Sequence, residues 1–208
     1  EGECELRVTA KAPTGGEAQA LLRPTVEQVK ALFGPKVYGV DVPSLEYVVL
    51  EGLKEKGLTL GTAESITGGL IAKRLTDVPG ASAAFQGGVV SYTNEVKAQL
   101  LQVPQTLLDQ FGAVSREVAA AMAQGARKAL GCDIALASTG VAGPDRDGRG
   151  NEVGTAFVAI AAGDQTYVRP LRLGPRPMRE RIRTQVASHA FDLARRYLAG
   201  LPFEDGNP

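Results

Sequence analysis

The sequence has no tryptophan, one histidine, two cysteines and a formal net charge of zero over 208 residues. Both Cys4 and Cys132 lie in apolar runs, so they predict buried thiols, and two cysteines do not build the disulfide framework of a small secreted protein. A neutral chain has no overall field that would draw it to nucleic acid or to a membrane. Neither a signal peptide nor a spanning segment is recognisable, and we expect a cytoplasmic protein with no membrane contact.

Several common catalytic signatures are also missing. The one histidine, His189, lies in an arginine-rich segment near the end of the chain and is a poor candidate for the base of a serine hydrolase. There is no Gly-x-Ser-x-Gly or Ser-x-x-Lys, and no Gly-x-Gly-x-x-Gly follows a strand. Without a Cys/His cluster or paired carboxylates at ligand spacing, we expect neither a metal nor a cofactor.

The most informative stretch is Thr62-Ala63-Glu64-Ser65-Ile66-Thr67-Gly68-Gly69. An apolar run precedes it, and apolar residues at helical spacing follow it, so it predicts a strand-to-helix turn. Glycines allow a ligand to approach the backbone closely, and Ser65 lies where an exposed hydroxyl could act as a nucleophile. The alternative is that Ser65 and Thr67 only cap the helix.

Strands and helices alternate from about residue 44 onward. Such alternation predicts an α/β fold, a three-layer α/β/α sandwich with a mixed, mostly parallel sheet, because the last two strands read as a hairpin. Ligands of such sheets bind beyond the carboxyl ends of the strands. Ser65, Tyr92 and Thr139 each follow or close a predicted strand, which is the first sign of one site. The strands are expected at 58–63, 85–92, 132–137, 153–162 and 166–173, and the last helix at 177–198.

The first 43 residues read as a small α+β appendage. Residues 4–10 and 36–40 resemble strands, and a helix between them should break or kink at Pro24. This piece is too small to bury its own core, so we expect it to pair with missing chain or with a partner subunit in a homodimer. The expected organisation is therefore residues 1–43, a main domain over 44–202 and a flexible tail over 203–208, with a mobile loop at 145–151.

A serine nucleophile needs a base, and with histidine scarce the next candidate is Lys97, in the first turn of the helix after Tyr92. Its pKa of about 10.4 must fall through burial or a nearby cation. The alternatives are a solvated lysine, or a dehydrogenase in which tyrosine and lysine lie one helical turn apart. The spacing from Tyr92 to Lys97 is five, which argues against the dehydrogenase.

Arg179 and Arg183 lie one helical turn apart and, with the turn at 62–69 and a second small-residue turn at 138–144, could hold a phosphate. The alternative is a solvated basic face. Nucleic acid binding by the first 43 residues is a further alternative, but we do not expect it, because they have little aromatic interleaving and no strong motif.

Five motifs occur in order and together resemble the C-terminal nicotinamide-nucleotide amidase domain of the CinA family. That resemblance implies hydrolysis of nicotinamide mononucleotide to nicotinate mononucleotide and ammonia without a metal. It also implies that residues 1–43 are the end of a KH-like middle domain, which longer members precede with a nucleotide-pyrophosphatase-like domain. The motifs are Ala63-Glu64-Ser65-x-Thr67-Gly68-Gly69, Pro79-Gly80-Ala81-Ser82, Phe85-x-Gly87-Gly88-Val89-Val90-x-Tyr92-x-Asn94-x-x-Lys97, Gly112-Ala113-Val114-Ser115 and Thr139-Gly140-Val141-Ala142-Gly143-Pro144.

The resemblance assigns catalysis to Ser65, Tyr92 and Lys97, with Ser65 attacking the carboxamide and Lys97, helped by the Tyr92 hydroxyl, moving the proton. Backbone N–H groups around Gly68 and Gly69, or near Gly140, would hold the oxyanion. The competing hypothesis is a non-catalytic nucleotide-binding or regulatory module of a competence- or damage-inducible protein. The resemblance also implies substrate contacts at Ser82, Thr139 and Arg179. The glycine turns and the second arginine complete the expected set with Thr67, Gly68, Gly69, Gly140 and Arg183.

Overall fold

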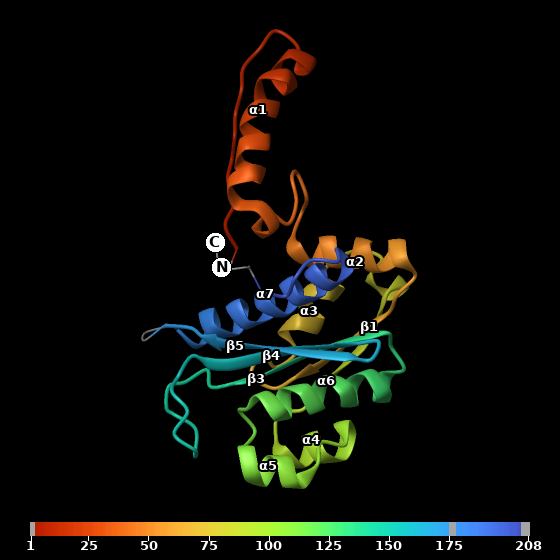
Figure 1. Cartoon of the computed structure of the whole chain (residues 1–208), viewed down its shortest axis with the longest axis vertical. Helices are drawn as coiled ribbons and strands as arrows, with labels where there is room; N and C mark the ends of the chain where they lie inside the picture. Colours follow the sequence, from red (N-terminus) through yellow and green to blue (C-terminus); the bar gives the residue numbers. More distant parts are fainter. Residues whose placement is uncertain (1–2, 175–177, 205–208) are drawn as a thin grey trace.

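A computed structural model describes residues 3–174 and 178–204 of the chain. Its centre is a five-stranded sheet in the order β2-β1-β3-β4-β5, with helices on both faces (Figure 1). On one face lie α2, α3 and α7; on the other α6 covers the sheet, and α4 and α5 pack against α6. The expected three-layer α/β fold is therefore confirmed. The strands are β1 Leu60–Glu64, β2 Phe85–Val90, β3 Ile134–Gly140, β4 Thr155–Ala162 and β5 Gln165–Arg172.

The sheet is mixed. β1 pairs in parallel with both β2 and β3, whereas β3–β4 and β4–β5 are antiparallel. Two of the four strand pairings are thus parallel and two are antiparallel, where the sequence predicts a mostly parallel sheet. Since β1, β2 and β3 run the same way, their carboxyl ends meet at one edge, where Glu64 is level with both Val90 and Ser138.

Apolar side chains fill both interfaces between sheet and helices. Strand β1 is buried over its whole length and β3 up to its last residue, as their continuous apolar or small-residue sequences predict for strands covered on both faces. Helix capping follows the sequence closely: Ser44, Thr93 and Ser115 accept backbone N–H groups at the starts of α2, α4 and α6. The cap of α4 is Thr93, the residue before Asn94. The body helices are α2 Leu45–Lys56, α3 Leu70–Thr76, α4 Asn94–Leu101, α5 Gln105–Phe111, α6 Arg116–Leu130 and α7 Arg179–Leu198.

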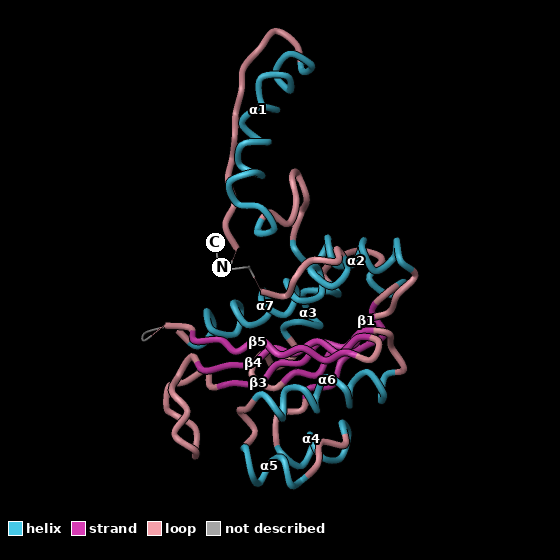
Figure 2. Tube along the Cα trace, viewed as in Figure 1, coloured by secondary structure: helices cyan, strands magenta, loops and turns pink. Residues whose placement is uncertain are grey.

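The first 43 residues differ from expectation. Helix α1, Gly15–Phe33, projects away from the sheet and buries no residue, and the strands expected at 4–10 and 36–40 do not form (Figures 1 and 2). A strand needs a neighbour to take its backbone hydrogen bonds, and the described chain offers none here. The expected break at Pro24 is also wrong, because α1 continues through it.

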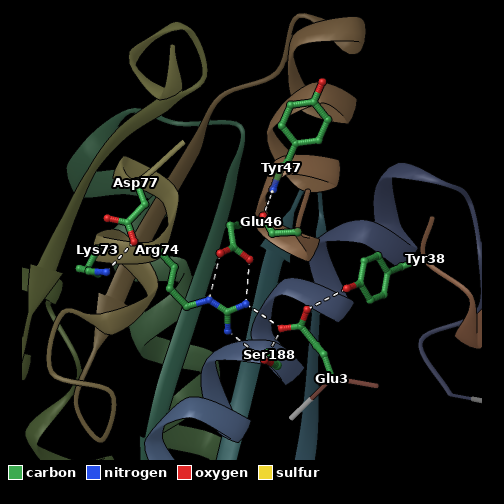
Figure 3. Close-up of polar contacts among 9 residues, drawn as sticks. Glu3, Tyr38, Glu46, Tyr47, Lys73, Arg74, Asp77 and Ser188 are labelled. Carbon is green, nitrogen blue, oxygen red and sulfur yellow. Dashed lines mark hydrogen bonds and ion pairs between the residues drawn. The ribbon is translucent and has the colours of Figure 1, made fainter. Parts of the chain in front are cut away.

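A polar cluster ties this N-terminal segment to the body (Figure 3). The guanidinium of Arg74, on α3, donates to Glu46 of α2 at 2.7 Å, to Glu3 at 2.7 Å and to the Ser188 hydroxyl of α7 at 2.9 Å. Tyr38 donates to the same Glu3 carboxylate at 3.0 Å. One arginine therefore joins three helices of the body to the start of the chain.

Residues 203–204 and the polar loop, which were expected to be flexible or mobile, both contact other parts of the described chain. Phe203 stacks on Tyr167 with ring centroids 4.5 Å apart, and Tyr167 donates to Glu204, so residues 203–204 are attached to β5. The rest of the expected tail, 205–208, and the expected helix start at Pro177 lie outside the described residues. The loop 145–151, expected to be mobile, is anchored by Arg149, which donates to backbone carbonyls at the end of α5. In the described ranges, no helix is both long and apolar enough to cross a bilayer.

Candidate active site

Ser65 lies directly after β1, at the edge where the parallel strands end. Its N–H donates to the Ser138 carbonyl at 2.9 Å, so the backbone of the residue is still held by the neighbouring strand. The side chain is half-buried and remains reachable from solvent. The expectation that Ser65, Tyr92 and Thr139 gather at one sheet edge agrees with the strand register.

The side chain of Lys97 reaches the Ser65 hydroxyl from α4. It is the fourth residue of α4, only 1% exposed, and its Nζ lies 3.1 Å from the Oγ of Ser65. The same Nζ donates to the main-chain carbonyls of Ser91 at 2.8 Å and Tyr92 at 3.3 Å. These carbonyls can only accept, so a neutral amine that gives its two N–H groups to them turns its lone pair toward Ser65. The geometry thus prepares Lys97 to take a proton from the serine.

Burial lowers the pKa of Lys97 to about 8, against a nearby Glu95 that acts in the opposite direction. Desolvation disfavours the ammonium form because the charge loses its hydration. No carboxylate is bonded to the amine in the described structure, so little holds the proton on it. A useful fraction of Lys97 is therefore neutral near neutral pH.

The Tyr92 side chain plays a different part from the one expected. It is 60% exposed, and its hydroxyl accepts from Nη2 of Arg179 at 3.2 Å, while its carbonyl is what reaches Lys97. Arg179, the first residue of α7, also donates to the carbonyl of Gly143 at 2.6 Å. The Tyr92 hydroxyl is therefore paired with Arg179 rather than placed in a proton relay to the lysine.

Next to Arg179 lies a cavity of about 1290 Å³ between the loop after β3 and the start of α7. Its lining includes Gly143, Arg172 and Arg179. Arg179 thus faces both the Tyr92 hydroxyl and an open space large enough for a nucleotide-sized ligand.

Arg183, one turn further along α7, donates from Nη2 to the carbonyl of Thr67 at 2.7 Å. A Cβ at Gly68 would lie 3.2 Å from that Nη2, and Gly68 has a φ of +58°, so glycine suits this position on both counts. Arg183 therefore braces the serine turn, and only its remaining donors could reach a substrate.

Two predicted contact residues use their hydroxyls within the protein. Thr67 Oγ1 lies 2.7 Å from Ser138 Oγ, and Thr139 donates to the carbonyl of Ala113 at 2.6 Å. Both threonines are buried. Gly140 serves packing, because a Cβ there would lie 2.6 Å from the Cβ of Ala156. These residues shape the wall of the site instead of presenting donors to its interior.

Ser82 is not brought to this site within one chain. It lies in the short 3₁₀ helix Ala81–Ala83, before β2, whereas Ser65 follows the parallel strand β1. Strand β2 spans six residues, so the two positions are separated by about 20 Å of sheet, at about 3.3 Å per residue. The expected contact between Ser82 and a substrate held at Ser65 is therefore wrong for a single chain.

The sequence reading missed Glu64, which stands beside the nucleophile in the quoted motif but was given no role. Glu64 is 1% exposed, and its carboxylate accepts the N–H of Gly69. That N–H was one of the groups expected to bind the oxyanion. The only sequence signal was a charged residue at the end of an otherwise apolar strand. In the described part of the chain, no three His, Cys, Asp or Glu side chains cluster in a way that would hold a metal ion.

Fold and site together define a three-layer α/β protein whose serine and buried lysine meet where the parallel strands end. The family model "CinA C-terminal domain" matches residues 43–198, and the model "Damage-inducible protein CinA KH domain" matches residues 1–39. The chain belongs to the CinA family.

Curated relatives agree with this family. A CinA-like protein of Desulfovibrio desulfuricans is 46% identical over 207 residues, covering 99% of this chain and 49% of the relative. One of Frankia casuarinae is 51% identical, covering 97% of this chain and 46% of the relative. The chain thus spans about half the length of the curated relatives it matches.

Solved structures show the same fold. A CinA superfamily protein of Klebsiella pneumoniae superposes with a TM-score of 0.72 at 31% identity, covering 75% of this chain and 96% of that one. A competence/damage-inducible protein of Agrobacterium tumefaciens gives a TM-score of 0.68 at 37% identity, covering 71% and 90%. In both comparisons the matched region covers most of the solved chain but only about three quarters of this one.

Proposed function

We propose that the chain is an amidohydrolase that converts nicotinamide mononucleotide to nicotinate mononucleotide and ammonia. The observation that carries the proposal is the 3.1 Å contact between Lys97 Nζ and Ser65 Oγ, with the lysine buried and its pKa lowered to about 8. Burying an amine without a carboxylate partner costs folding free energy, and such perturbed groups are concentrated at functional sites. A neutral lysine in this position can act as the base that activates a serine.

The first half of the reaction forms an ester. Lys97 takes the proton of Ser65, the serine oxygen attacks the carboxamide carbon, and the resulting ammonium returns a proton to the departing nitrogen, which leaves as ammonia. The pyridinium charge of the substrate makes the carbonyl more electrophilic and favours the neutral amine.

The second half frees the enzyme. Lys97 takes a proton from water, the hydroxide attacks the ester carbon, and the serine oxygen leaves with the proton that Lys97 returns. The product carries a carboxylate where the substrate carried an amide.

The hydrogen bonds within the serine turn limit which N–H groups can bind the oxyanion. Gly69 donates to Glu64, and Leu70 donates to the carbonyl of Thr67. Of the two glycine N–H groups expected to hold the oxyanion, that of Gly69 is thus already bonded, which leaves that of Gly68 as the candidate donor in this turn. Arg179, beside the cavity, is the candidate for the substrate phosphate.

Ammonia release from nicotinamide mononucleotide tests the proposal. Ser65→Ala should reduce turnover at least 1,000-fold while substrate still binds, because the nucleophile is gone. Lys97→Arg should be equally inactive, since a guanidinium stays protonated. Lys128→Arg, on the exposed face of α6, is the matched control and should keep wild-type turnover.

Each outcome separates two hypotheses. Binding of the nucleotide without ammonia release by the wild-type protein would favour a non-catalytic nucleotide-binding or regulatory module. Turnover that survives Ser65→Ala would remove the serine as nucleophile.

A further inference from the structure

The carboxylate of Glu64 is buried beneath the first turn of α3. One oxygen, Oε2, accepts the N–H groups of Gly69 at 2.9 Å and Ile71 at 3.0 Å. The other, Oε1, accepts the N–H of Ala72 at 2.8 Å and the Thr62 hydroxyl at 3.3 Å. Four donors thus converge on one side chain that is 1% exposed.

These bonds replace the usual cap of α3. The residue in the N-cap position is Gly69, which has no side chain, so the helix has no local acceptor for its first N–H groups. Glu64 supplies that acceptor from the preceding strand, and its negative charge is favourable at the positive end of the helix. The bond from Gly69 to Glu64 also closes residues 64–69 into a ring, and Ser65 is the first residue inside it.

The ring fixes the nucleophile from the side opposite its base. Glu64 reaches the α3 face of the sheet, whereas the Ser65 hydroxyl reaches Lys97 of α4, on the other face. Lys97 is held separately, by the carbonyls of Ser91 and Tyr92. Loss of the ring would therefore move the serine without moving the lysine.

We infer that Glu64 is a positioning residue, which holds the Ser65 turn in register with the Lys97 amine and occupies the N-terminus of α3 so that the substrate's phosphate must bind elsewhere. The inference deepens the proposed amidase function and rests on it. It predicts that kcat depends on Glu64, whereas KM and the pH midpoint set by Lys97 do not.

Glu64→Gln is the informative change because it keeps the size of the side chain but turns one acceptor oxygen into an NH₂ group, which cannot accept an N–H. The control is Asp133→Asn. Asp133 also accepts a backbone N–H, from Thr59 at 2.8 Å, but at the opposite end of β1. Both variants lose a carboxylate acceptor beside the same strand, and only one touches the serine turn.

Two readouts are measured well below the unfolding temperature and per mole of folded protein. One is ammonia release from nicotinamide mononucleotide across pH 6 to 9.5. The other is the rate at which a fluorophosphonate labels Ser65, which needs an activated serine but no particular substrate. Glu64→Gln should lower kcat and the labelling rate about 10- to 100-fold with KM and pH midpoint unchanged, and Asp133→Asn should match wild type.

The inference is overturned if Glu64→Gln stays within twofold of wild type in both readouts, or if only KM changes. Should wild type label but release no ammonia, the amidase function fails while labelling still decides the role of Glu64. If wild type neither labels nor turns over, Ser65 is not activated and both ideas fail.

If Glu64→Gln does not fold, Thr62→Val is the second variant, because it removes one donor to the same carboxylate. Labelling that is about two- to fivefold slower supports the inference, and an unchanged rate overturns it.

Discussion

Arg183 and Thr67 lie on segments 116 residues apart, yet the arginine donates to the threonine carbonyl at 2.7 Å. The C-terminal helix thereby braces the serine turn from outside, while its first residue, Arg179, contacts Tyr92 and lines the cavity. The two arginines, one helical turn apart, therefore have separable tasks.

Replacing each arginine by alanine should separate binding from turnover. Arg179→Ala should raise KM for nicotinamide mononucleotide about tenfold or more and leave kcat nearly intact, because it removes a phosphate contact. The nucleoside, which lacks the phosphate, should lose little. Arg183→Ala should instead lower kcat about tenfold for both substrates, because the turn loses its brace. Equal losses of Arg179→Ala on nucleotide and nucleoside would contradict the phosphate contact.

The pH dependence of catalysis should follow Lys97. Burial lowers the pKa of this amine to about 8, and the base acts only when neutral. kcat/KM should therefore rise as pH increases and level off above about 8, and kcat should level off at lower pH because the bound pyridinium cation disfavours the ammonium. Steady-state ammonia assays from pH 6 to 9.5, with circular dichroism to confirm folding at each pH, measure both. A rate that is flat over this range would exclude Lys97 as the base.

The same amine should make stability depend on pH. The folded protein releases this proton near pH 8, whereas the unfolded chain keeps it until about 10.5, so the unfolded state binds more protons in between. The free energy of unfolding should therefore rise with pH across that window, by about 3 kcal/mol relative to Lys97→Met. Urea unfolding of both proteins at pH 7 to 10.5 gives the difference. A constant difference would show that Lys97 keeps an ordinary pKa when folded.

Much of the fold and part of the candidate site could be predicted because local sequence decides them. Strand β3 is a continuous apolar run and forms as expected, and the helical spacing of apolar residues after Ser115 corresponds to α6. Ser65 and Lys97 each lie at the junction of a strand and a helix, and the parallel sheet brings such junctions together. Their contact follows from topology that alternation alone already implies.

Other features depend on the whole chain and could not be read locally. Residues 4–10 alternate like a strand, but the described part of the chain offers no neighbouring strand to pair with them, so they form no strand there. Ser82 stands near Ser65 in sequence, yet a strand separates them in space. Glu64 turns back beneath a helix that begins six residues later, and no periodicity reports such a side-chain cap.

The attachment of the N-terminal segment should depend on Arg74. Its guanidinium lies between the carboxylates of Glu3 and Glu46 and is only 14% exposed (Figure 3). Arg74→Met would leave two carboxylates facing each other, so we expect a loss of about 2 to 4 kcal/mol in the free energy of unfolding and faster tryptic cleavage of residues 3–43. Lys73→Met is the matched control: this residue, directly before Arg74 on α3, is 67% exposed and paired with Asp77, and its replacement should change stability by less than about 1 kcal/mol. Equal effects of the two changes, by urea unfolding and timed proteolysis, would show that the cluster does not hold the segment. Burial alone would raise the pKa of Glu3, but its bonds to Arg74, Ser188 and Tyr38 lower it, so acidification through that pKa should loosen the wild-type segment. In Arg74→Met the same acidification should not loosen the segment further, because protonation there relieves the repulsion between the two carboxylates.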